Sequence, residues 1–173
     1  GMRIVDLGCG SGRLSSVLYQ SADVSYVGTD IIPQLLSYAK RKALKYEFIC
    51  HRDLSIPQSN ESANIVCAFS LFTHLHQAET FIYLEECYRI LKPDGLALFS
   101  FLEFSAPAHW EVFIKTKTFT KNRKLDHLNV FLERTTIKIW ADKLGFELLE
   151  FIEPDCPVWN NRSLGQSVVV LRK

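Results

Sequence analysis

The stretch Val5-Asp-Leu-Gly-Cys-Gly-Ser-Gly-Arg13 places three glycines at alternate positions, directly after an apolar run and directly before a helical pattern. Glycine tolerates a positive φ and lets a backbone come close to a ligand. The N-terminus of the helix that follows offers free N–H groups and a partial positive charge to an anion. The stretch therefore predicts a strand, a ligand-binding turn and a helix, with a ligand that carries a carboxylate or a phosphate.

Strand-like and helix-like segments alternate along the rest of the chain. Helices are expected after the glycine turn, after Pro33, over 77–92, and from a cap at Thr136 to Gly145. Short apolar runs predict seven strands, at 3–7, 24–31, 46–50, 63–71, 96–102, 146–152 and 168–172. This alternation predicts an α/β fold, with a doubly wound and mostly parallel sheet that has helices on both faces. No helical crossover separates the last two strands, so we expect an antiparallel pair at one edge.

A single domain over residues 1–173 is expected, with an insertion at 103–133 after the fifth strand. The length of 173 residues suits one hydrophobic core. Residues 103–133 show no clear periodic pattern, and they leave the fifth strand at its carboxyl end, where such sheets bind ligands. We therefore expect the insertion to lie over the active-site edge and to select the substrate.

The composition excludes several classes of protein. A formal net charge of +1 argues against a generally basic nucleic-acid binder. The longest apolar runs fall far short of the ~20 residues that span a membrane. The five cysteines are scattered, with no Cys-x-x-Cys pair, and indicate free thiols in a reducing, cytoplasmic setting. His74 and His76 lack a nearby Cys or carboxylate that would complete a ligand set, so no metal is expected.

The glycine spacing narrows the choice of nucleotide. Gly8 and Gly10 match the start of the dinucleotide fingerprint, and Asp30 lies at a suitable distance. However, Arg13 occupies the position of the third glycine, where the helix must pack tightly. No Walker lysine follows, so the P-loop pattern fails as well.

Four motifs in order resemble the class I S-adenosylmethionine-dependent methyltransferases of the small-molecule type. They are "VDLGCGSG", the acidic residue that ends the second strand, "HRDLSIP" after the third strand, and "RILKPDGLALFSF" at the fifth. The stretches "FSLFTHL" and "GQSVVVLRK" are also similar to this family. The resemblance implies a Rossmann-like seven-stranded sheet with the last strand antiparallel, S-adenosylmethionine as cofactor and S-adenosylhomocysteine as product.

The resemblance also assigns cofactor-binding residues. The glycine turn would approach the methionine carboxylate and the sugar, and the acidic residue before it would lie near the methionine end. Asp30 would accept both ribose hydroxyls. Asp53 would meet the adenine amino group, and the side chains of Ile31 and Leu54 would hold the two faces of the adenine. In chain order the residues are Asp6, Gly8, Cys9, Gly10, Gly12, Asp30, Ile31, Asp53, Leu54, Phe69 and Ser70, the last two beside the methionine portion.

Each acidic residue also has a purely structural interpretation. Asp6 could bond the N–H groups of the turn, Asp30 could cap the helix that starts at Pro33, and Asp53 could be a turn residue. Asn64 stands where the family usually has an aspartate, at a position that is normally structural. The family usually carries a segment before the first strand, whereas the first predicted strand of this sequence begins at Arg3. We therefore expect either that the chain is a truncated product or that it covers the cofactor in another way.

Methyl transfer is an in-line displacement, so the protein mainly positions the reactants. His74 is the best candidate for a general base, because it follows the fourth strand at the carboxyl edge. Its alternative is a turn histidine bonded to backbone. His109, His127 and Glu103 are weaker candidates. The Asp/Asn-Pro-Pro-Tyr/Phe signature of nucleic-acid amino methyltransferases is absent from "AFSLFTH", which argues against a nucleic-acid substrate.

Two functions therefore stand open. The first is a methyltransferase that acts on a small-molecule acceptor; the second is a non-catalytic cofactor-binding protein, or a truncated methyltransferase, that serves a partner. Five basic residues among aromatic ones in the insertion favour an anionic acceptor with a flat or apolar body. The alternative is a solvated basic loop. The basic residues are Lys115, Lys117, Lys121, Arg123 and Lys124, and the aromatic ones are Trp110, Phe113 and Phe119. The oligomeric state does not follow from the sequence.

Overall fold

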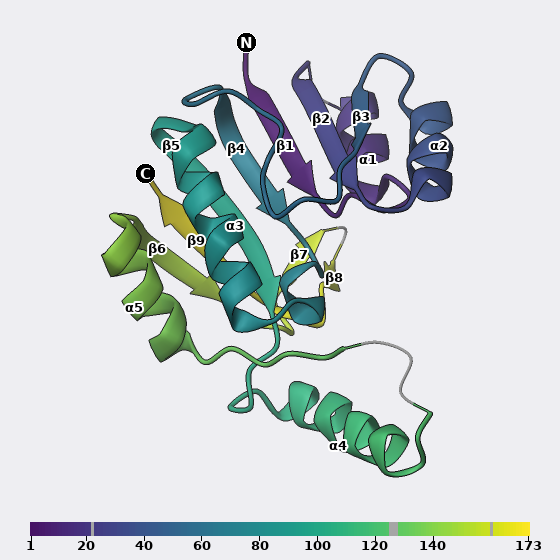
Figure 1. Ribbon diagram of the computed structural model, residues 1–173, viewed down its shortest axis with the longest axis vertical. Helices are drawn as coiled ribbons and strands as arrows, with labels where there is room; N and C mark the ends of the chain where they lie inside the picture. Colours follow the sequence, from purple (N-terminus) through teal and green to yellow (C-terminus); the bar gives the residue numbers. More distant parts are fainter. Residues whose placement is uncertain (22, 125–127, 160) are drawn as a thin grey trace.

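The computed structural model describes residues 1–21, 23–124, 128–159 and 161–173, and it contains one seven-stranded sheet (Figure 1). The order of the strands across the sheet is β3-β2-β1-β4-β5-β9-β6, in which β9 alone is antiparallel to its neighbours. The strands are β1 (Arg3–Leu7), β2 (Ser25–Asp30), β3 (Glu47–Cys50), β4 (Ala63–Ala68), β5 (Leu91–Phe101), β6 (Glu147–Ile152) and β9 (Ser167–Arg172). The predicted fold class is confirmed, and the antiparallel pair β6–β9 occupies one edge as expected, with β6 outermost.

Helices cover both faces of the sheet. Figure 1 shows α3 (Gln77–Ile90) in front of the sheet and α1 (Arg13–Ser21) behind it. Each face has its own buried core, because alternate residues of a strand point to opposite sides. Val5 packs in the core beneath α3 and α5 (Arg134–Leu144), while Ile4 packs in the core beneath α1 and α2 (Pro33–Lys42).

The helices follow their apolar stripes. In α2, Leu36, Ala39 and the following Ala43 are buried, as the spacing predicts. Helix α5 ends at Gly145, whose φ of 86° is the left-handed conformation that glycine adopts readily. The predicted cap at Thr136 is wrong, because α5 begins two residues earlier, at Arg134, after Glu133.

The boundary between α3 and β5 also differs from the prediction. The helix ends at Ile90, and β5 begins at Leu91, five residues before the expected start. Leu91 pairs with Ala63, and regular pairing resumes at Ile65 and Leu96. The Pro-Asp-Gly turn therefore lies within β5, in the irregular part between Leu91 and Leu96 where the pairing with β4 changes register.

Two elements were not expected. Residues 107–121, which show no periodic pattern, form the 15-residue helix α4 (Pro107–Lys121). It lies beyond the carboxyl end of β5, at the lower end of the molecule in Figure 1. A small hairpin of β7 (Pro157–Trp159) and β8 (Arg162–Ser163) separates β6 from β9. Within the described residues, no helix is long and apolar enough to cross a membrane.

Candidate functional site: the carboxyl edge of β1, β2 and β4

The glycine turn leaves β1 at the carboxyl edge of the sheet. Gly8, Gly10 and Gly12 have φ values of 65°, 53° and 76°, which favour glycine. The Cys9 N–H donates to the Thr29 carbonyl of β2 over 3.0 Å, and the Gly12 N–H donates to the Cys9 carbonyl over 3.0 Å. These bonds bind the turn to the neighbouring strand and set the direction in which α1 begins.

The turn is packed on one side and open on the other. A Cβ atom at Gly12 would lie 2.7 Å from the Cβ of Ala39 in α2. A Cβ atom at Gly10 would meet nothing closer than the Gly8 carbonyl oxygen, at 4.0 Å. The backbone at Gly10 is therefore accessible to a ligand, whereas Gly12 allows the close packing of the turn on α2.

Asp30 joins the turn to the end of β2. One of its carboxylate oxygens accepts the Gly10 N–H over 2.9 Å, and the other accepts the Ile32 N–H over 2.9 Å. No side chain caps α2, so Asp30 is not the helix cap that its position before Pro33 suggested. Each carboxylate oxygen has a second lone pair, and these remaining acceptors lie beside the open side of the turn.

Asp6 takes a different position, beneath the turn. It is 4 % exposed, and it accepts a 2.6 Å hydrogen bond from the Tyr26 hydroxyl. Burial raises the pKa of Asp6 from 3.8 to about 7, because the charged form loses its hydration. The bond from Tyr26 opposes this rise in pKa, and the negative charge of Asp30 adds to it. Sequence reasoning missed Tyr26, since the two residues lie on neighbouring strands.

Two apolar side chains are exposed near the ends of β2 and β3. Ile31 is 57 % exposed and Leu54 is 40 % exposed, next to the exposed Asp53. The Tyr83 hydroxyl of α3 donates to the Asp53 carbonyl over 3.3 Å and so joins this loop to α3. Exposed aliphatic side chains beside an acidic one suit the faces and the amino group of a purine.

At the end of β4, Phe69 is partly buried and Ser70 is exposed. Ser70 has a φ of 58°, which is uncommon for a residue with a side chain. Its N–H donates to the hydroxyl of Ser100 over 2.7 Å, and its own hydroxyl donates to Oε1 of Gln166 over 3.2 Å. Ser100 and Gln166 were not predicted from the sequence, because they are 30 and 96 residues away from Ser70.

His74 lies in a short 3-10 turn, η1 (Phe72–His74), after β4. Its Nδ1 lies 2.7 Å from the carbonyl oxygen of Leu128. A carbonyl only accepts, so Nδ1 carries the hydrogen, and in the neutral ring Nε2 is the acceptor that a general base needs. The Val130 N–H donates to the Thr73 carbonyl over 2.8 Å, so the end of the insertion returns to this turn. The candidate base His127 lies outside the described residues.

Glu103 and His109, the other candidate bases, are fully buried. The Glu103 N–H donates to Nδ1 of His109 over 3.0 Å. The Glu103 carboxylate accepts bonds from Arg134, Ser105 and Ser167. Burial alone would raise the pKa of Glu103, but these bonds outweigh it and hold the pKa below its usual value. Glu103 therefore joins the start of the insertion to β9 through Ser167, and His109 joins the start of α4 to the backbone of Glu103.

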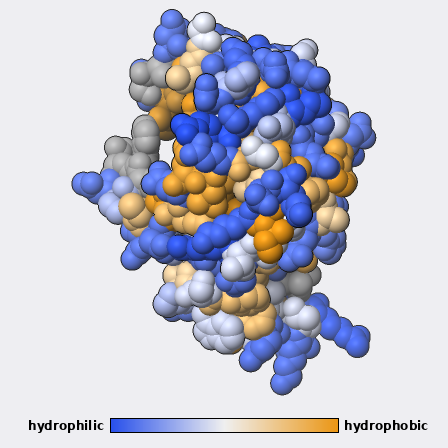
Figure 2. Space-filling model, turned by 90° about the vertical axis from the view of Figure 1, so that its left-hand side faces the viewer, coloured by the Kyte–Doolittle hydropathy of each residue, from blue (hydrophilic) through white to orange (hydrophobic). Residues whose placement is uncertain are grey.

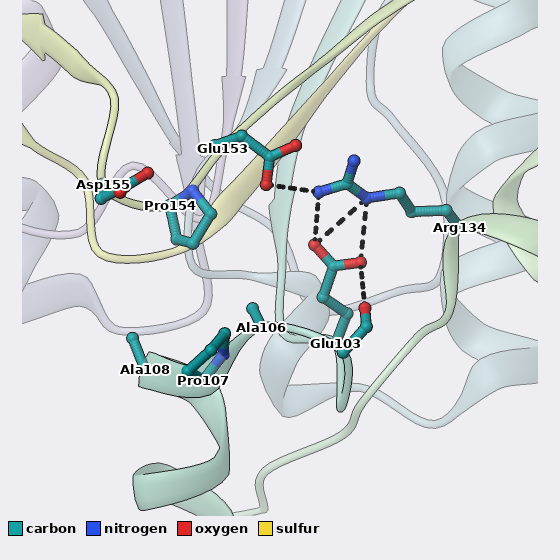
Figure 3. Close-up of a pocket in the computed structure, with 9 residues that line it drawn as sticks. Glu103, Ala106, Pro107, Ala108, Arg134, Glu153, Pro154 and Asp155 are labelled. Atoms are coloured by element: carbon teal, nitrogen blue, oxygen red, sulfur yellow. Dashed lines mark hydrogen bonds and ion pairs between the residues drawn. The ribbon is translucent and has the colours of Figure 1, made fainter.

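A cavity of about 600 Å³ lies beside the ion pair of Glu103 with Arg134, between the start of α4 and the turn after β6. Figure 3 shows Arg134 between the carboxylates of Glu103 and Glu153, above Pro107 of α4. Arg134 binds both oxygens of Glu103, and its Nη2 also lies 2.8 Å from Glu153. The cavity opens at the carboxyl ends of β5 and β6, on the same edge of the sheet as the glycine turn.

The insertion combines aromatic and basic side chains, as the sequence indicated. Phe104 stacks on Phe131 with ring centres 4.4 Å apart, and Phe113 contacts both rings edge-on. Trp110 and Phe119 are 50 % and 46 % exposed. Figure 2 shows hydrophobic side chains beside hydrophilic ones that project from the lower end of the molecule, where α4 lies. The exposed basic residues there are Lys115, Lys117, Lys121, Arg123 and Lys124.

The five cysteines are free; Cys9, Cys67 and Cys87 are buried, and Cys50 and Cys156 are exposed. Among the residues that the structure describes, no cluster of three or more His, Cys, Asp or Glu side chains could hold a metal ion.

Comparison with known proteins decides the family. The family model described as "Methyltransferase domain" matches residues 4–95, which include the glycine turn, Asp30 and Asp53. The chain belongs to the class I S-adenosylmethionine-dependent methyltransferases. The predicted class I methyltransferase family is thus confirmed, together with the enzyme class and S-adenosylmethionine as the cofactor.

Individual relatives are distant. The ubiquinone biosynthesis O-methyltransferase of Haemophilus ducreyi is 23 % identical over 161 residues, which cover 87 % of this chain and 67 % of that protein. The mitochondrial ubiquinone biosynthesis O-methyltransferase of Mus musculus is 31 % identical over 104 residues, or 55 % of this chain and 27 % of that protein. This methyltransferase chain therefore spans between about a quarter and two thirds of the length of these two relatives.

The fold also matches a solved structure over nearly its whole length. A SAM-dependent methyltransferase of Methanosarcina mazei superposes with a TM-score of 0.80 at 18 % identity, covering 99 % of this chain and 92 % of that one. At this identity the match supports the architecture of the methyltransferase sheet.

Proposed function

We propose that this chain transfers the methyl group of S-adenosylmethionine to a small-molecule acceptor at the carboxyl edge of β1, β2 and β4. The observation on which the proposal rests is the junction of Gly10 with Asp30, where an open backbone lies beside a carboxylate with unused lone pairs. A cofactor with a carboxylate and a ribose diol needs both features. The ubiquinone O-methyltransferases among the relatives favour an oxygen atom as the acceptor.

In this proposal, each predicted residue has one task toward the cofactor. Asp30 accepts the two ribose hydroxyls with its second lone pairs. Ile31 and Leu54 hold the faces of the adenine, and Asp53 meets its amino group. The turn over Gly8, Cys9, Gly10 and Gly12 approaches the methionine and the sugar, Asp6 supports the methionine end from beneath, and Phe69 and Ser70 lie beside the methionine.

The cofactor supplies an activated methyl group on a positively charged sulfur. The chain then has to orient the acceptor in line with that methyl group and exclude water. His74 is the proposed general base, and the bond from its Nδ1 to the Leu128 carbonyl orients the ring. The five basic residues of the insertion favour an anionic acceptor, and the unpaired thiols favour a reducing, cytoplasmic setting.

Titration calorimetry with S-adenosylhomocysteine tests the site. Asp30→Ala removes the carboxylate that would bind the ribose, so binding should weaken by about 1.5–3 kcal/mol, the range for a hydrogen bond to a charged group. The control is Asp142→Ala, which removes an exposed carboxylate on α5. Equal affinities for the Asp30 variant and the wild type would remove Asp30 from the site.

A turnover assay then separates the two functions. Methyl transfer from S-adenosylmethionine to any member of a panel of hydroxyl and carboxylate acceptors supports the enzyme. Tight cofactor binding without transfer to the whole panel would support a cofactor-binding protein that serves a partner.

A further inference from the structure

Gln166 lies at the carboxyl edge of the sheet, although it directly precedes β9, the last strand of the chain. Strand β9 is antiparallel, so its first residues pair with the last residues of β5, with Ser167 opposite Phe101. Topology therefore places Gln166 beside Ser70, which follows β4 and is 96 residues away in the sequence. The stretch "GQSVVVLRK", noted for its similarity to the family, thus reaches the predicted methionine end of the site.

Two serine hydroxyls fix the orientation of the Gln166 carboxamide. The Ser100 hydroxyl lies 2.6 Å from Oε1 of Gln166, and the Ser70 hydroxyl lies 3.2 Å from the same atom. Ser100 is fully buried, and its oxygen already accepts the Ser70 N–H, so its hydrogen is directed at Gln166. Both hydroxyls therefore donate to the oxygen of the carboxamide, and the NH2 group takes the opposite position on the carboxamide.

The NH2 group of Gln166 has no hydrogen-bond partner within the described part of the chain, and Gln166 is partly exposed. A structural role accounts for Oε1, which satisfies the buried hydroxyl of Ser100. It does not account for Nε2, because a carboxylate at this position would satisfy both serines equally well. The choice of an amide thus points to the two N–H donors that the amide adds.

We propose that the NH2 group of Gln166 donates a hydrogen bond to an oxygen atom of the methyl acceptor and so positions that acceptor at the end of β4. The proposal rests on the proposed methyltransferase function. The chemical class of the acceptor follows from the donor. It carries a hydroxyl, carbonyl or carboxylate oxygen next to the atom that is methylated, and it lies between Gln166 and the turn that holds His74.

The test uses the full chain saturated with S-adenosylhomocysteine, with salicylate as the probe, since it carries a hydroxyl next to a carboxylate. Ligand-observed NMR gives the dissociation constant of salicylate for each protein. Gln166→Glu keeps the oxygen that the serines bind but removes the donor and adds a charge. Gln166→Met removes the donor without adding a charge. Gln20→Glu is the matched control, because it adds the same charge at an exposed position at the far end of α1.

Gln166→Met should weaken salicylate binding about 10-fold and Gln166→Glu by more, as expected for loss of a hydrogen bond to a charged oxygen. Affinity for S-adenosylhomocysteine should stay within about twofold of the wild type in all variants, because in this proposal the NH2 group contacts the acceptor and not the cofactor. The midpoint of thermal unfolding of Gln166→Glu should stay close to that of the wild type, since its contacts to both serines remain.

Two results overturn the proposal. One is a wild-type protein that binds S-adenosylhomocysteine but not salicylate; the other is a pair of Gln166 variants that bind salicylate as the wild type does. A wild-type protein that fails to bind S-adenosylhomocysteine at all contradicts the proposed function itself, so the two failures are distinguishable.

Discussion

Gly10 and Gly12 lie two residues apart in one turn, but their backbones meet different surroundings. A side chain at Gly12 would press into α2, whereas a side chain at Gly10 would enter the open space where a ligand would bind. The same residue type therefore serves the packing of the fold at one position and access to the site at the other. The two effects can be separated by measuring stability and cofactor affinity on the same variants.

Gly12→Ala should lower the free energy of unfolding by about 2–4 kcal/mol. The new Cβ atom would lie 2.6 Å from the Ser15 hydroxyl and 2.7 Å from the Cβ of Ala39, and the φ of 76° disfavours alanine. Gly10→Ala should cost only about 1 kcal/mol, for its φ of 53°, and yet reduce S-adenosylhomocysteine affinity at least about 10-fold. Urea unfolding and calorimetry measure the two quantities. Equal losses of stability in both variants would contradict this division.

Asp6 should make the stability of the fold depend on pH. Its pKa is about 7 in the folded state and near 3.8 when exposed, so between these values the folded protein binds more protons than the unfolded one. The free energy of unfolding should therefore fall as pH rises from about 4 to about 7, by up to roughly 4 kcal/mol for a shift of about three units. Asp6→Asn keeps an oxygen for Tyr26 and should remove this fall.

Urea unfolding at pH 5 and pH 8 measures the effect. From pH 5 to pH 8 the free energy of unfolding should fall less for Asp6→Asn than for the wild type. Asp23→Asn, which changes an exposed carboxylate, should show the pH dependence of the wild type. An unchanged slope in Asp6→Asn would show that Asp6 is ionised throughout this range.

At the scale of elements, the insertion is joined to the sheet by a few specific contacts. Helix α4 lacks an apolar stripe, and three of its threonines donate their hydroxyls to carbonyls one turn earlier. Its inner side packs with Phe113 on the stacked rings of Phe104 and Phe131. At the start of the insertion, the buried carboxylate of Glu103 pairs with the partly exposed Arg134 and so joins the end of β5 to the start of α5.

Arg134→Gln should lower the free energy of unfolding by about 3 kcal/mol at pH 8, because it leaves the buried carboxylate of Glu103 without its cation. The double variant Glu103→Gln/Arg134→Gln should recover part of this loss, since no buried charge remains. Lys143→Gln, at an exposed position on the same helix, is the control and should change stability by less than about 0.5 kcal/mol. A loss in Arg134→Gln no larger than in the control would show that the ion pair contributes little to stability.

For the whole molecule, the two cores on either side of the sheet determine which thiols a reagent can reach. Cys67 lies in the core beneath α1 and α2, and Cys87 lies in the core beneath α3 and α5. Burial raises the pKa of both thiols far above the usual value, as it does for Cys9 in the glycine turn. Cys50 and Cys156 are exposed.

A thiol titration with a disulfide reagent should therefore occur in two phases. In the native protein Cys50 and Cys156 should react within the fast phase, and the three buried thiols should react only as the fold opens. In denaturant without reductant the total should be five. A total below five would reveal a disulfide, and a third fast thiol in the native protein would show that one of the buried sulfurs is accessible.

The sequence alone predicted the seven strands of the sheet and four of its helices in their order along the chain, and it located the glycine turn. The bounds of β1 match the prediction, and the glycine turn, Asp30 and the stripes of α2 and α5 could all be identified. These features are local, since a strand, a turn or a helical stripe shows itself within about 18 residues of sequence. The resemblance of motifs to the methyltransferase family rests on such local patterns, and so do the cofactor-binding residues that it assigns.

Only the tertiary structure decided which distant residues meet. It inserted β9 between β5 and β6 and thereby placed Gln166 beside Ser70. It also put the Asp6 carboxylate under the Tyr26 hydroxyl and made a helix of residues 107–121, which pack on aromatic rings from both ends of the insertion. The physical reason is that strand pairing and burial are contacts between segments far apart in the chain. Their partners cannot be inferred from the residues of one segment, even though they determine the charge, orientation and accessibility of the site.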